Sequence, residues 1–223
     1  MKKYKADEDL NKYAAYLLES LLKKVITEDE YFALVAESSA VAYMARKEPW
    51  EQSGHGGDAL SYRFKKMMIL EAVYRPGTFL DIGSANGYLV SCLYSWIGNT
   101  FPDMKFYGLE ISEELTQLSR KLWPDLKDNF YIGNVFKWKP EQKFDYVYTM
   151  IMPEIPENLR KYFMSLLFSD YVKKNGRLIL GEAGIDKYEK EIIQMGYNIT
   201  GCCEKTVNDG RTKRIIWIDN TYG

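Results

Sequence analysis

The residues with the clearest chemical potential lie in the stretch FLDIGSANGYLV, residues 79–90. An apolar run leads into Asp81, and Gly83 and Gly87 follow before an apolar helical pattern begins. Glycine permits a tight turn and a close approach of the backbone to a ligand. The pattern therefore predicts a strand that turns sharply into a helix, around a phosphate, a dinucleotide, another nucleoside, or no ligand at all.

Two common nucleotide-binding loops do not fit this stretch. A P-loop ends in Gly-Lys-Ser/Thr, but Gly87 is followed by Tyr88 and Leu89. A dinucleotide-binding loop has the pattern GxGxxG, whereas Gly83-Ser84-Ala85-Asn86-Gly87 has a different spacing and lacks the middle glycine. The missing lysine excludes a P-loop. The different spacing and the missing middle glycine argue against a dinucleotide-binding loop.

The stretch resembles motif I of the class I S-adenosylmethionine-dependent methyltransferases, in which an acidic residue and one spacer precede GxGxG. Asp81 and Ile82 match this start, and Ala85 stands in place of the middle glycine. Its methyl group adds little bulk, so the backbone can still approach a ligand. S-adenosylmethionine carries no phosphate, which agrees with a loop that has no cationic residue.

Positions further along the chain extend the resemblance over residues 78–220. Glu110 ends the next strand pattern, where a carboxylate can accept hydrogen bonds from both ribose hydroxyls. Asn134 follows the third strand pattern, at the family position that meets the adenine amino group, and Val135 and Phe136 are placed to flank the ring. The cofactor-binding residues implied in this way are Asp81, Gly83, Ser84, Ala85, Asn86, Gly87, Glu110, Ile111, Asn134, Val135 and Thr149.

A closer resemblance lies in EQSGHGGDALSYRFKK, residues 51–66, which is similar to a segment of a bacterial group of small methyltransferases with no settled substrate. Arg63 is a candidate clamp for the cofactor carboxylate, because a guanidinium can grip a carboxylate with two hydrogen bonds. The alternative is a surface cation. We also expect Ser53, Gly54, Gly56 and Gly57 to form a flexible lid.

Catalytic groups are expected beyond the carboxyl ends of the parallel strands. Glu154 and Glu182 fall there, and either can accept a proton from a substrate nucleophile. His55, the only histidine, is a third candidate base, although a lone loop histidine is often inert. Asp145 begins the fourth strand, at the opposite end, where a structural role is expected. Met150-Ile151-Met152-Pro153 replaces the Asn-Pro-Pro-Tyr signature, which disfavours adenine and glutamine as acceptors.

The elements that must position these residues begin with helix patterns over residues 13–25 and 28–46, the second with a capping box at Thr27 and Glu30. Asp58 is placed to cap a third helix that runs to residue 74. From residue 78, strand and helix patterns alternate, which indicates βαβ units and a parallel sheet. A late helix, over residues 158–174, is predicted to stop at Asn175-Gly176.

The chain ends in two β-rich runs joined by Asn208-Asp209-Gly210-Arg211, a strong hairpin signal. An antiparallel pair there completes the seven-stranded sheet of the family that the chain resembles. The fold class expected is therefore α/β: a Rossmann-like, mostly parallel seven-stranded sheet with a C-terminal antiparallel hairpin and an N-terminal helical cap. We expect residues 1–57 to form the cap and glycine-rich loop, and residues 58–223 the methyltransferase domain.

Composition narrows the range of partners. The 223 residues are 46% hydrophobic and 27% charged, which is typical of a globular protein. A net charge of -1 gives no general attraction to nucleic acid. Three cysteines without CxxC spacing argue against a disulfide framework and a metal site. The N-terminal segment MKKYKADEDL lacks a signal-peptide core, and no apolar run is long enough to span a bilayer, so we expect a cytoplasmic protein without membrane contact.

The sequence thus predicts methyl transfer from S-adenosylmethionine to an unidentified small molecule. One alternative is an RNA or protein methyltransferase, which a basic surface patch near the cleft would favour, formed by Lys65, Lys66, Lys121 and Lys127. Others are a binding module that holds the cofactor without catalysis, and an NAD-dependent enzyme. Oligomeric state leaves no signal in the sequence.

Overall fold

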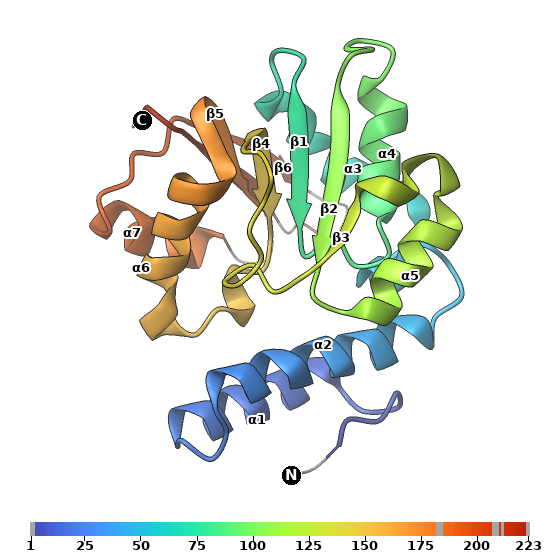
Figure 1. The fold of residues 1–223 in the computed structure, drawn as a ribbon, viewed down its shortest axis with the longest axis vertical. Helices are drawn as coiled ribbons and strands as arrows, with labels where there is room; N and C mark the ends of the chain where they lie inside the picture. The colour runs from blue at the N-terminus through green and yellow to red at the C-terminus, as the bar shows by residue number, and fades with distance from the viewer. Residues whose placement is uncertain (1–2, 182–184, 207–209, 211, 222–223) are drawn as a thin grey trace.

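A seven-stranded sheet forms the centre of the fold, with strand order β3-β2-β1-β4-β5-β7-β6 (Figure 1). The computed structural model describes residues 3–181, 185–206, 210 and 212–221. β1 to β5 run parallel, and β7 is antiparallel to both β5 and β6. The strands are β1 (Thr78–Ile82), β2 (Lys105–Glu110), β3 (Phe130–Ile132), β4 (Phe144–Thr149), β5 (Val172–Leu180), β6 (Gly201–Thr206) and β7 (Thr212–Asp219).

This topology confirms the fold class expected from the sequence, including the closing antiparallel pair. Of the predicted hairpin turn, Asn208, Asp209 and Arg211 lie outside the described residues. The helices are α1 (Leu10–Leu22), α2 (Glu28–Met44), α3 (Ala59–Lys66), α4 (Tyr88–Ile97), α5 (Glu113–Leu122), α6 (Glu157–Leu166) and α7 (Asp186–Gln194).

Helices cover both faces of the sheet, and the side chains of the strands contribute to two separate hydrophobic cores, one on each face. Successive side chains of a strand point to opposite faces. Phe79 and Ile179 therefore pack toward α3 and α4, while Leu80 and Leu178 pack toward α6 and α7. Because the parallel strands are buried on both faces, they read as continuous apolar runs in the sequence.

The helices α1 and α2 form the N-terminal cap, which lies across the carboxyl-end edge of the parallel strands (Figure 1). The predicted capping box is present: Glu30 N donates to Thr27 Oγ1 at 3.2 Å, and Thr27 N donates to Glu30 Oε2 at 2.8 Å. Ile26 and Tyr31 are buried in one cluster with residues of α1. The start of α2 is thus fixed by local sequence, and its position by packing on α1.

The helix after Asp58 is shorter than its sequence pattern suggests. α3 ends at Lys66, and the chain continues as a 3-10 helix over Met67–Ala72. Met68, Ile69 and Ala72 are buried there. The tighter winding directs these apolar side chains into the core beneath β6, and this packing overrides the α-helical pattern.

The predicted helix end at Asn175-Gly176 is wrong. α6 ends at Leu166, a single π-helical turn follows over Leu167–Tyr171, and β5 already begins at Val172. The pairing of β4 with β5 shifts register in this region, and Asn175 has a φ of 60°. Asn175-Gly176 is therefore part of a bulge within the strand, a setting in which asparagine tolerates the left-handed conformation.

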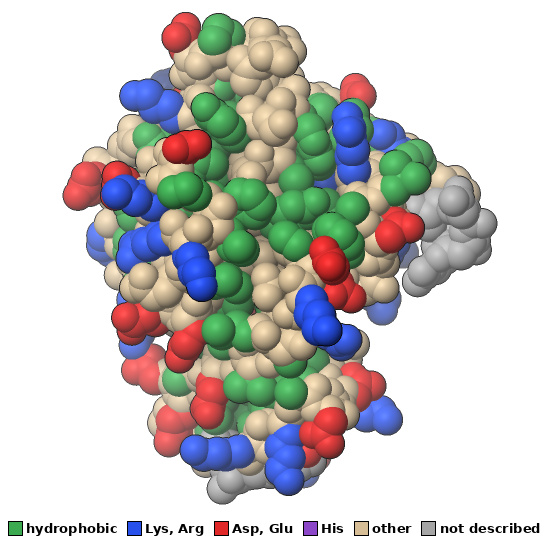
Figure 2. Space-filling model, turned by 90° about the vertical axis from the view of Figure 1, so that its right-hand side faces the viewer, with side chains coloured by type: hydrophobic (Ala, Val, Ile, Leu, Met, Phe, Trp, Pro, Cys, Tyr) green, Lys and Arg blue, Asp and Glu red, His purple; other side chains and the backbone are tan. Residues whose placement is uncertain are grey.

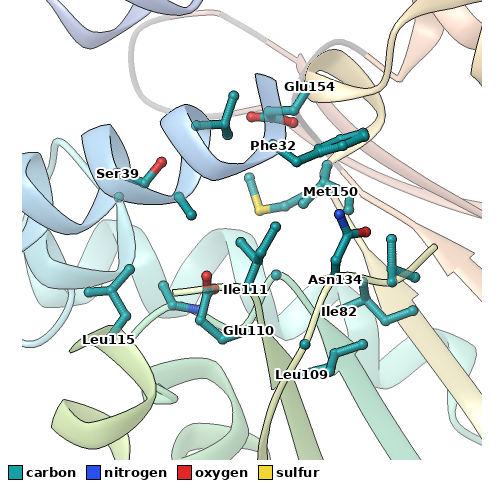
Figure 3. Close-up of a pocket in the computed structure, with 18 of the residues that line it drawn as sticks. Phe32, Ser39, Ile82, Leu109, Glu110, Ile111, Leu115, Asn134, Met150 and Glu154 are labelled. Carbon is teal, nitrogen blue, oxygen red and sulfur yellow. The ribbon is translucent and has the colours of Figure 1, made fainter. Parts of the chain in front are cut away.

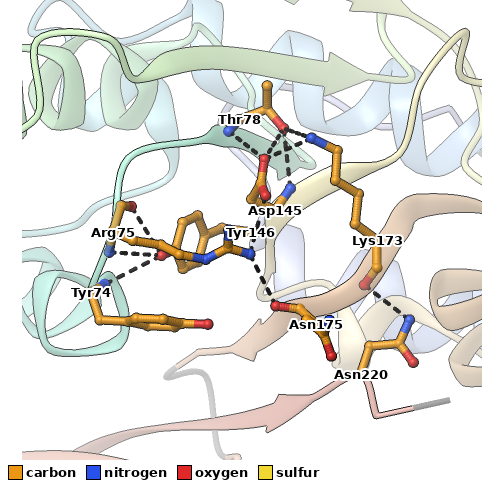
Figure 4. A network of polar contacts seen from close by, with 8 residues as sticks. All are labelled: Tyr74, Arg75, Thr78, Asp145, Tyr146, Lys173, Asn175 and Asn220. Atoms are coloured by element: carbon orange, nitrogen blue, oxygen red, sulfur yellow. Dashed lines mark hydrogen bonds and ion pairs between the residues drawn. The ribbon is translucent and has the colours of Figure 1, made fainter. Parts of the chain in front are cut away.

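A polar network ties together the amino ends of β1, β4 and β5 (Figure 4). The Asp145 carboxylate accepts hydrogen bonds from Thr78 N and Thr78 Oγ1, both at 2.9 Å, and pairs with Lys173 Nζ at 2.8 Å and Arg75 at 3.3 Å. Burial alone would raise the pKa of Asp145, but the hydrogen bonds from Lys173 and Thr78 outweigh it and lower the pKa. The structural role expected for Asp145 is confirmed.

We expect Asp145→Ala to lower the free energy of unfolding by roughly 2–3 kcal/mol near pH 7, because it leaves Thr78 and Lys173 without their acceptor. Since the folded-state pKa is lowered, this stabilisation is present above the unfolded-state pKa and is lost as the pH falls through the folded value. Urea unfolding near pH 7 and near pH 3 measures both effects.

Asp170→Ala is the control for this comparison, because Asp170 pairs with the exposed Lys139. Such surface pairs contribute about 1 kcal/mol or less. Equal losses in the two variants at neutral pH would contradict the role assigned to Asp145.

Candidate functional site

A cavity, here called the main cavity, opens at the carboxyl ends of β1, β2 and β4, and α2 covers it (Figure 3). Its floor comes from the loops after the strands, and its roof includes Phe32, Val35, Ser39 and Tyr43 of α2. The predicted site residues that line it are Gly83, Ala85, Glu110, Ile111, Asn134, Val135 and Glu154. The fold thus gathers residues from four segments, at the carboxyl ends of β1, β2, β3 and β4, around one space.

The other predicted residues of the turn between β1 and α4 are not part of the cavity lining. They hold the turn in place from the side away from the main cavity. Ser84 is buried, and its Oγ is the one buried side-chain polar atom without a hydrogen-bond partner in the described part of the chain. Asn86 donates from Nδ2 to the Pro49 carbonyl at 2.9 Å. Gly87 has a φ of 71°, and a Cβ there would lie 2.5 Å from the Phe130 ring. These residues allow the strand to turn into α4 within a crowded space.

Thr149, at the end of β4, is also turned away from the main cavity. Its hydroxyl donates to the Ile82 carbonyl at 3.2 Å and accepts from Ile151 N at 3.3 Å. The side chain therefore joins the ends of β1 and β4.

Glu110 presents a fixed carboxylate at the main cavity (Figure 3). One oxygen accepts a hydrogen bond from Ala85 N at 2.8 Å, and the other accepts from Ser112 N at 2.9 Å. Burial raises the pKa of Glu110, and the backbone hydrogen bonds from Ser112 and Ala85 oppose this rise. Each oxygen keeps a further lone pair, so the carboxylate can accept from two ligand hydroxyls.

Ala85 links the turn to the cap. It has a φ of 47°, in the left-handed region that favours glycine. Its N–H is held by Glu110, and its methyl group packs in a buried cluster with Ala40 of α2 and Leu115 of α5. The alanine at the middle position of the motif therefore provides a contact with the roof that glycine would lack.

Asp81 and Lys66 form a buried charged group behind the main cavity. Asp81 is 4% exposed, and burial raises its pKa to about 7, although the Lys66 charge opposes this. The Lys66 ammonium donates to Met150 Sδ at 3.1 Å and to the Tyr148 hydroxyl at 3.3 Å. Because Met150 is part of the cavity lining, this group lies directly behind the wall.

The neighbouring cations on α3 are arranged differently from the sequence expectation. Arg63 is exposed, with its guanidinium 5.9 Å from the centre of the Trp96 ring, and it is not part of the cavity lining. Lys66 is buried, so it cannot belong to a surface patch with Lys65, Lys121 and Lys127. The cation next to the main cavity is therefore Lys66, one turn of helix beyond the candidate Arg63.

The three candidate bases have different surroundings. Glu154 lies beside α2 near Phe32 (Figure 3) and lines the main cavity; its residue as a whole is exposed, although protein atoms surround its carboxylate. This desolvation raises the pKa of Glu154 to about 7. His55 lies outside the main cavity, with Nε2 2.8 Å from Ser61 Oγ. Glu182 lies outside the described residues.

The sequence favours a cap that shapes the substrate pocket, but the individual roof residues are the part of the site that sequence reasoning did not name. Phe32, Val35, Ser39 and Tyr43 carry no local signal for a binding site, because apolar positions on α2 are equally expected from its packing on α1. Met150 and Ile151 fall in the segment after the fourth strand where catalytic groups are expected, but the sequence does not mark them as wall residues. A recognisable cue would have been the length of the cap, which suffices to cover the edge of the sheet.

Two further observations bear on the possible partners. Among the described residues, no group of three or more His, Cys, Asp or Glu side chains could hold a metal ion. No helix in the described ranges is long and apolar enough to cross a membrane.

No family model matches the sequence, and no curated protein matches it. Solved structures do match. The magnesium protoporphyrin IX methyltransferase from Synechocystis, solved with bound S-adenosylmethionine, has a TM-score of 0.61 at 15% identity, over 85% of this chain and 96% of that one. A methyltransferase from Pyrococcus furiosus has a TM-score of 0.56 at 15% identity, over 88% and 100%. The [4+2]-cyclase SpnF has a TM-score of 0.55 at 10% identity, over 71% and 80%.

These likenesses show that the chain has the fold of the class I S-adenosylmethionine-dependent methyltransferases. A cyclase with the same fold illustrates that a fold does not determine a reaction. The function has to be argued from the chemistry of the main cavity.

The raised pKa of Asp81 makes the stability of the ligand-free protein depend on pH. Since the folded state holds this proton more tightly than the unfolded state, the contribution of Asp81 is full below the unfolded-state pKa and declines as the pH rises to about 7. We expect Asp81→Asn to remove this decline. The free energy of unfolding of the variant, relative to that of the wild type, should then rise by roughly 1.4 kcal/mol per pH unit between about pH 5 and pH 7.

Urea unfolding at intervals across this range measures the difference. Asparagine keeps the size of the side chain, so a packing change would add only a constant offset. Parallel pH curves for the two proteins would show that Asp81 is not the titrating group.

Proposed function

We propose that the protein is a methyltransferase that uses S-adenosylmethionine and acts on a small molecule. The observation that carries this proposal is the charge of the main cavity. Its lining includes the carboxylates of Glu110 and Glu154, and none of the described lining residues is Lys, Arg or His. Such a lining suits a cationic nucleoside and disfavours NAD or any other ligand with phosphates.

The shape and donor set of the main cavity fit S-adenosylmethionine. Glu110 offers two acceptor oxygens to a pair of ribose hydroxyls. Asn134 Oδ1 accepts from Phe136 N at 2.9 Å and has a second lone pair for an adenine amino group. Gly83 has a φ of 81°, and a Cβ there would lie 2.6 Å from Ile151 Cγ2, so the cradle has no room for a side chain. Ile111 and Val135 provide apolar walls for a ring.

The residues around the cavity have little covalent chemistry to perform. S-adenosylmethionine, when bound, supplies a methyl group that is already activated by its sulfonium. The chain has to orient the acceptor and exclude water, and α2 closes the cavity in the position needed for both. Glu154, with a pKa near 7, can accept the proton of a hydroxyl or amine nucleophile.

A small acceptor is favoured over RNA or protein by the roof and by the surface. The helix α2 covers the cavity, so a polymer would have to reach it past this helix. Figure 2 shows one face of the molecule, on which described basic and acidic side chains are interspersed around a band of hydrophobic ones. This face therefore offers no continuous basic surface for a phosphate backbone.

We expect Glu110→Ala to weaken the binding of S-adenosylhomocysteine at least about tenfold, because a hydrogen bond to a charged group contributes roughly 1.5–3 kcal/mol. Isothermal titration calorimetry measures the affinity, and thermal unfolding verifies that the variant is folded. Glu113→Ala, in the first turn of α5 and outside the cavity lining, is the matched control and should bind as the wild type does. Unchanged affinity in Glu110→Ala would refute the ribose assignment.

A further inference from the structure

A second cleft lies on the other side of Tyr43 from the main cavity. Tyr43 and Gly54 are the two described residues that line both spaces. The rest of the second cleft is formed by residues of the segment 4–11, by Ala42 of α2, by Arg46 just after that helix, and by the glycine-rich segment that contains Glu51, His55 and Gly56. The two spaces are therefore separated by one side chain and one stretch of backbone.

The partition depends on the close fit of Tyr43 against Gly54. A Cβ on Gly54 would lie 2.7 Å from the Tyr43 hydroxyl oxygen, and Gly54 has a φ of 83°. Glycine at this position lets the ring lie directly against the backbone. Burial raises the pKa of Tyr43 to about 12, so the hydroxyl is neutral at ordinary pH. Tyr43 is half-buried, and its hydroxyl forms no hydrogen bond with any described residue, which leaves it available to a ligand at the boundary.

The second cleft differs from the main cavity in its polarity. Its lining includes three carboxylates, from Glu8, Asp9 and Glu51, and two basic side chains, the Arg46 guanidinium and the His55 imidazole. The main cavity, by contrast, is lined largely by apolar side chains. An excess of carboxylates in a concave site attracts a cation and raises its local concentration.

Local contacts leave acceptor capacity in this cleft. Asp9 Oδ1 caps α1 by accepting from Asn11 N at 2.9 Å and Lys12 N at 3.3 Å. Glu51 Oε2 accepts from Glu48 N at 3.3 Å. A carboxylate has about four lone-pair positions, so both groups can accept further hydrogen bonds from a protonated amine.

We propose that the second cleft is the acceptor site and that it binds a small molecule carrying a protonated amine, whose reactive end reaches the main cavity at the boundary of Tyr43 and Gly54. This assignment rests on the proposed function, because the cleft is an acceptor site only if the main cavity holds the methyl donor. It gives the cap and the glycine-rich segment a common role, since both supply walls of the same cleft.

Three glycine amides allow a direct test by nuclear magnetic resonance on the full chain. Gly133 lines the main cavity, Gly56 lines the second cleft, and Gly54 lines both. We expect S-adenosylhomocysteine to shift the amide signals of Gly133 and Gly54. We expect benzylamine, added to the protein saturated with S-adenosylhomocysteine, to shift those of Gly56 and Gly54.

Charge selectivity is tested with benzyl alcohol and benzoate, which have the same ring as benzylamine. Benzylamine should bind at least about fivefold more tightly than either, because the carboxylates favour the cation. Glu51→Gln keeps an acceptor oxygen for Glu48 N but removes the charge, and it should weaken benzylamine at least about threefold without changing the affinity for S-adenosylhomocysteine. Glu48→Gln, outside the cleft lining, is the control and should bind both ligands as the wild type does.

The outcomes separate the two proposals. If S-adenosylhomocysteine binds but benzoate binds as tightly as benzylamine, or benzylamine leaves Gly56 and Gly54 unshifted, the acceptor assignment is overturned and the proposed function stands. If S-adenosylhomocysteine does not shift Gly133, the proposed function fails, and the acceptor role fails with it even where benzylamine still binds.

Discussion

The hydrogen bond from Ala85 N to the Glu110 carboxylate is the constraint on which the site depends. It joins the turn after β1 to the end of β2, and the second oxygen of Glu110 holds the start of the following turn through Ser112 N. The interaction maintains Ala85 in a left-handed conformation that costs about 1–2 kcal/mol for a residue other than glycine. That conformation in turn points the Ala85 methyl group at Ala40 of the cap. The Glu110 carboxylate therefore holds the turn that forms the floor, positions the Ala85 methyl group against the roof, and is itself a polar group in the cavity lining.

The same carboxylates explain why the cavity should prefer a cation. Glu110, Glu154 and Asp81 all have raised pKa values, because burial or crowding removes water from them and the charged form loses solvation. A positively charged ligand would restore part of what the missing water provided. The ligand-free protein thus holds poorly solvated carboxylates that would interact favourably with a bound cation. Such perturbed groups are common at functional sites.

Much of the fold could be predicted because local signals and global packing agree. The apolar runs mark β1 and β4, Thr27 and Glu30 form the expected capping box of α2, and the β-rich runs at the end pair antiparallel. The floor of the site was also accessible, since Glu110 and Asn134 end strand patterns and the carboxyl ends of parallel strands meet at one edge.

The remaining features depend on tertiary contacts that leave no local trace. The roof residues of α2 have the same apolar pattern that packing on α1 requires. Lys66 and Arg63 are both basic residues on one amphipathic helix, and only the packing of α3 on the sheet decides which of them is buried. Residues 172–174, which the sequence pattern assigned to a helix, belong to β5, because Val172 is fully buried and pairs with Phe144.

The central claim is that the main cavity binds S-adenosylmethionine. The most direct measurement is isothermal titration calorimetry of the wild-type protein with S-adenosylhomocysteine and, separately, with NAD. The acceptors at Glu110 and Asn134 predict one-to-one binding of S-adenosylhomocysteine with a Kd on the order of micromolar, about -8 kcal/mol. The charge of the lining predicts no detectable binding of NAD. Binding of NAD without binding of S-adenosylhomocysteine would contradict the account.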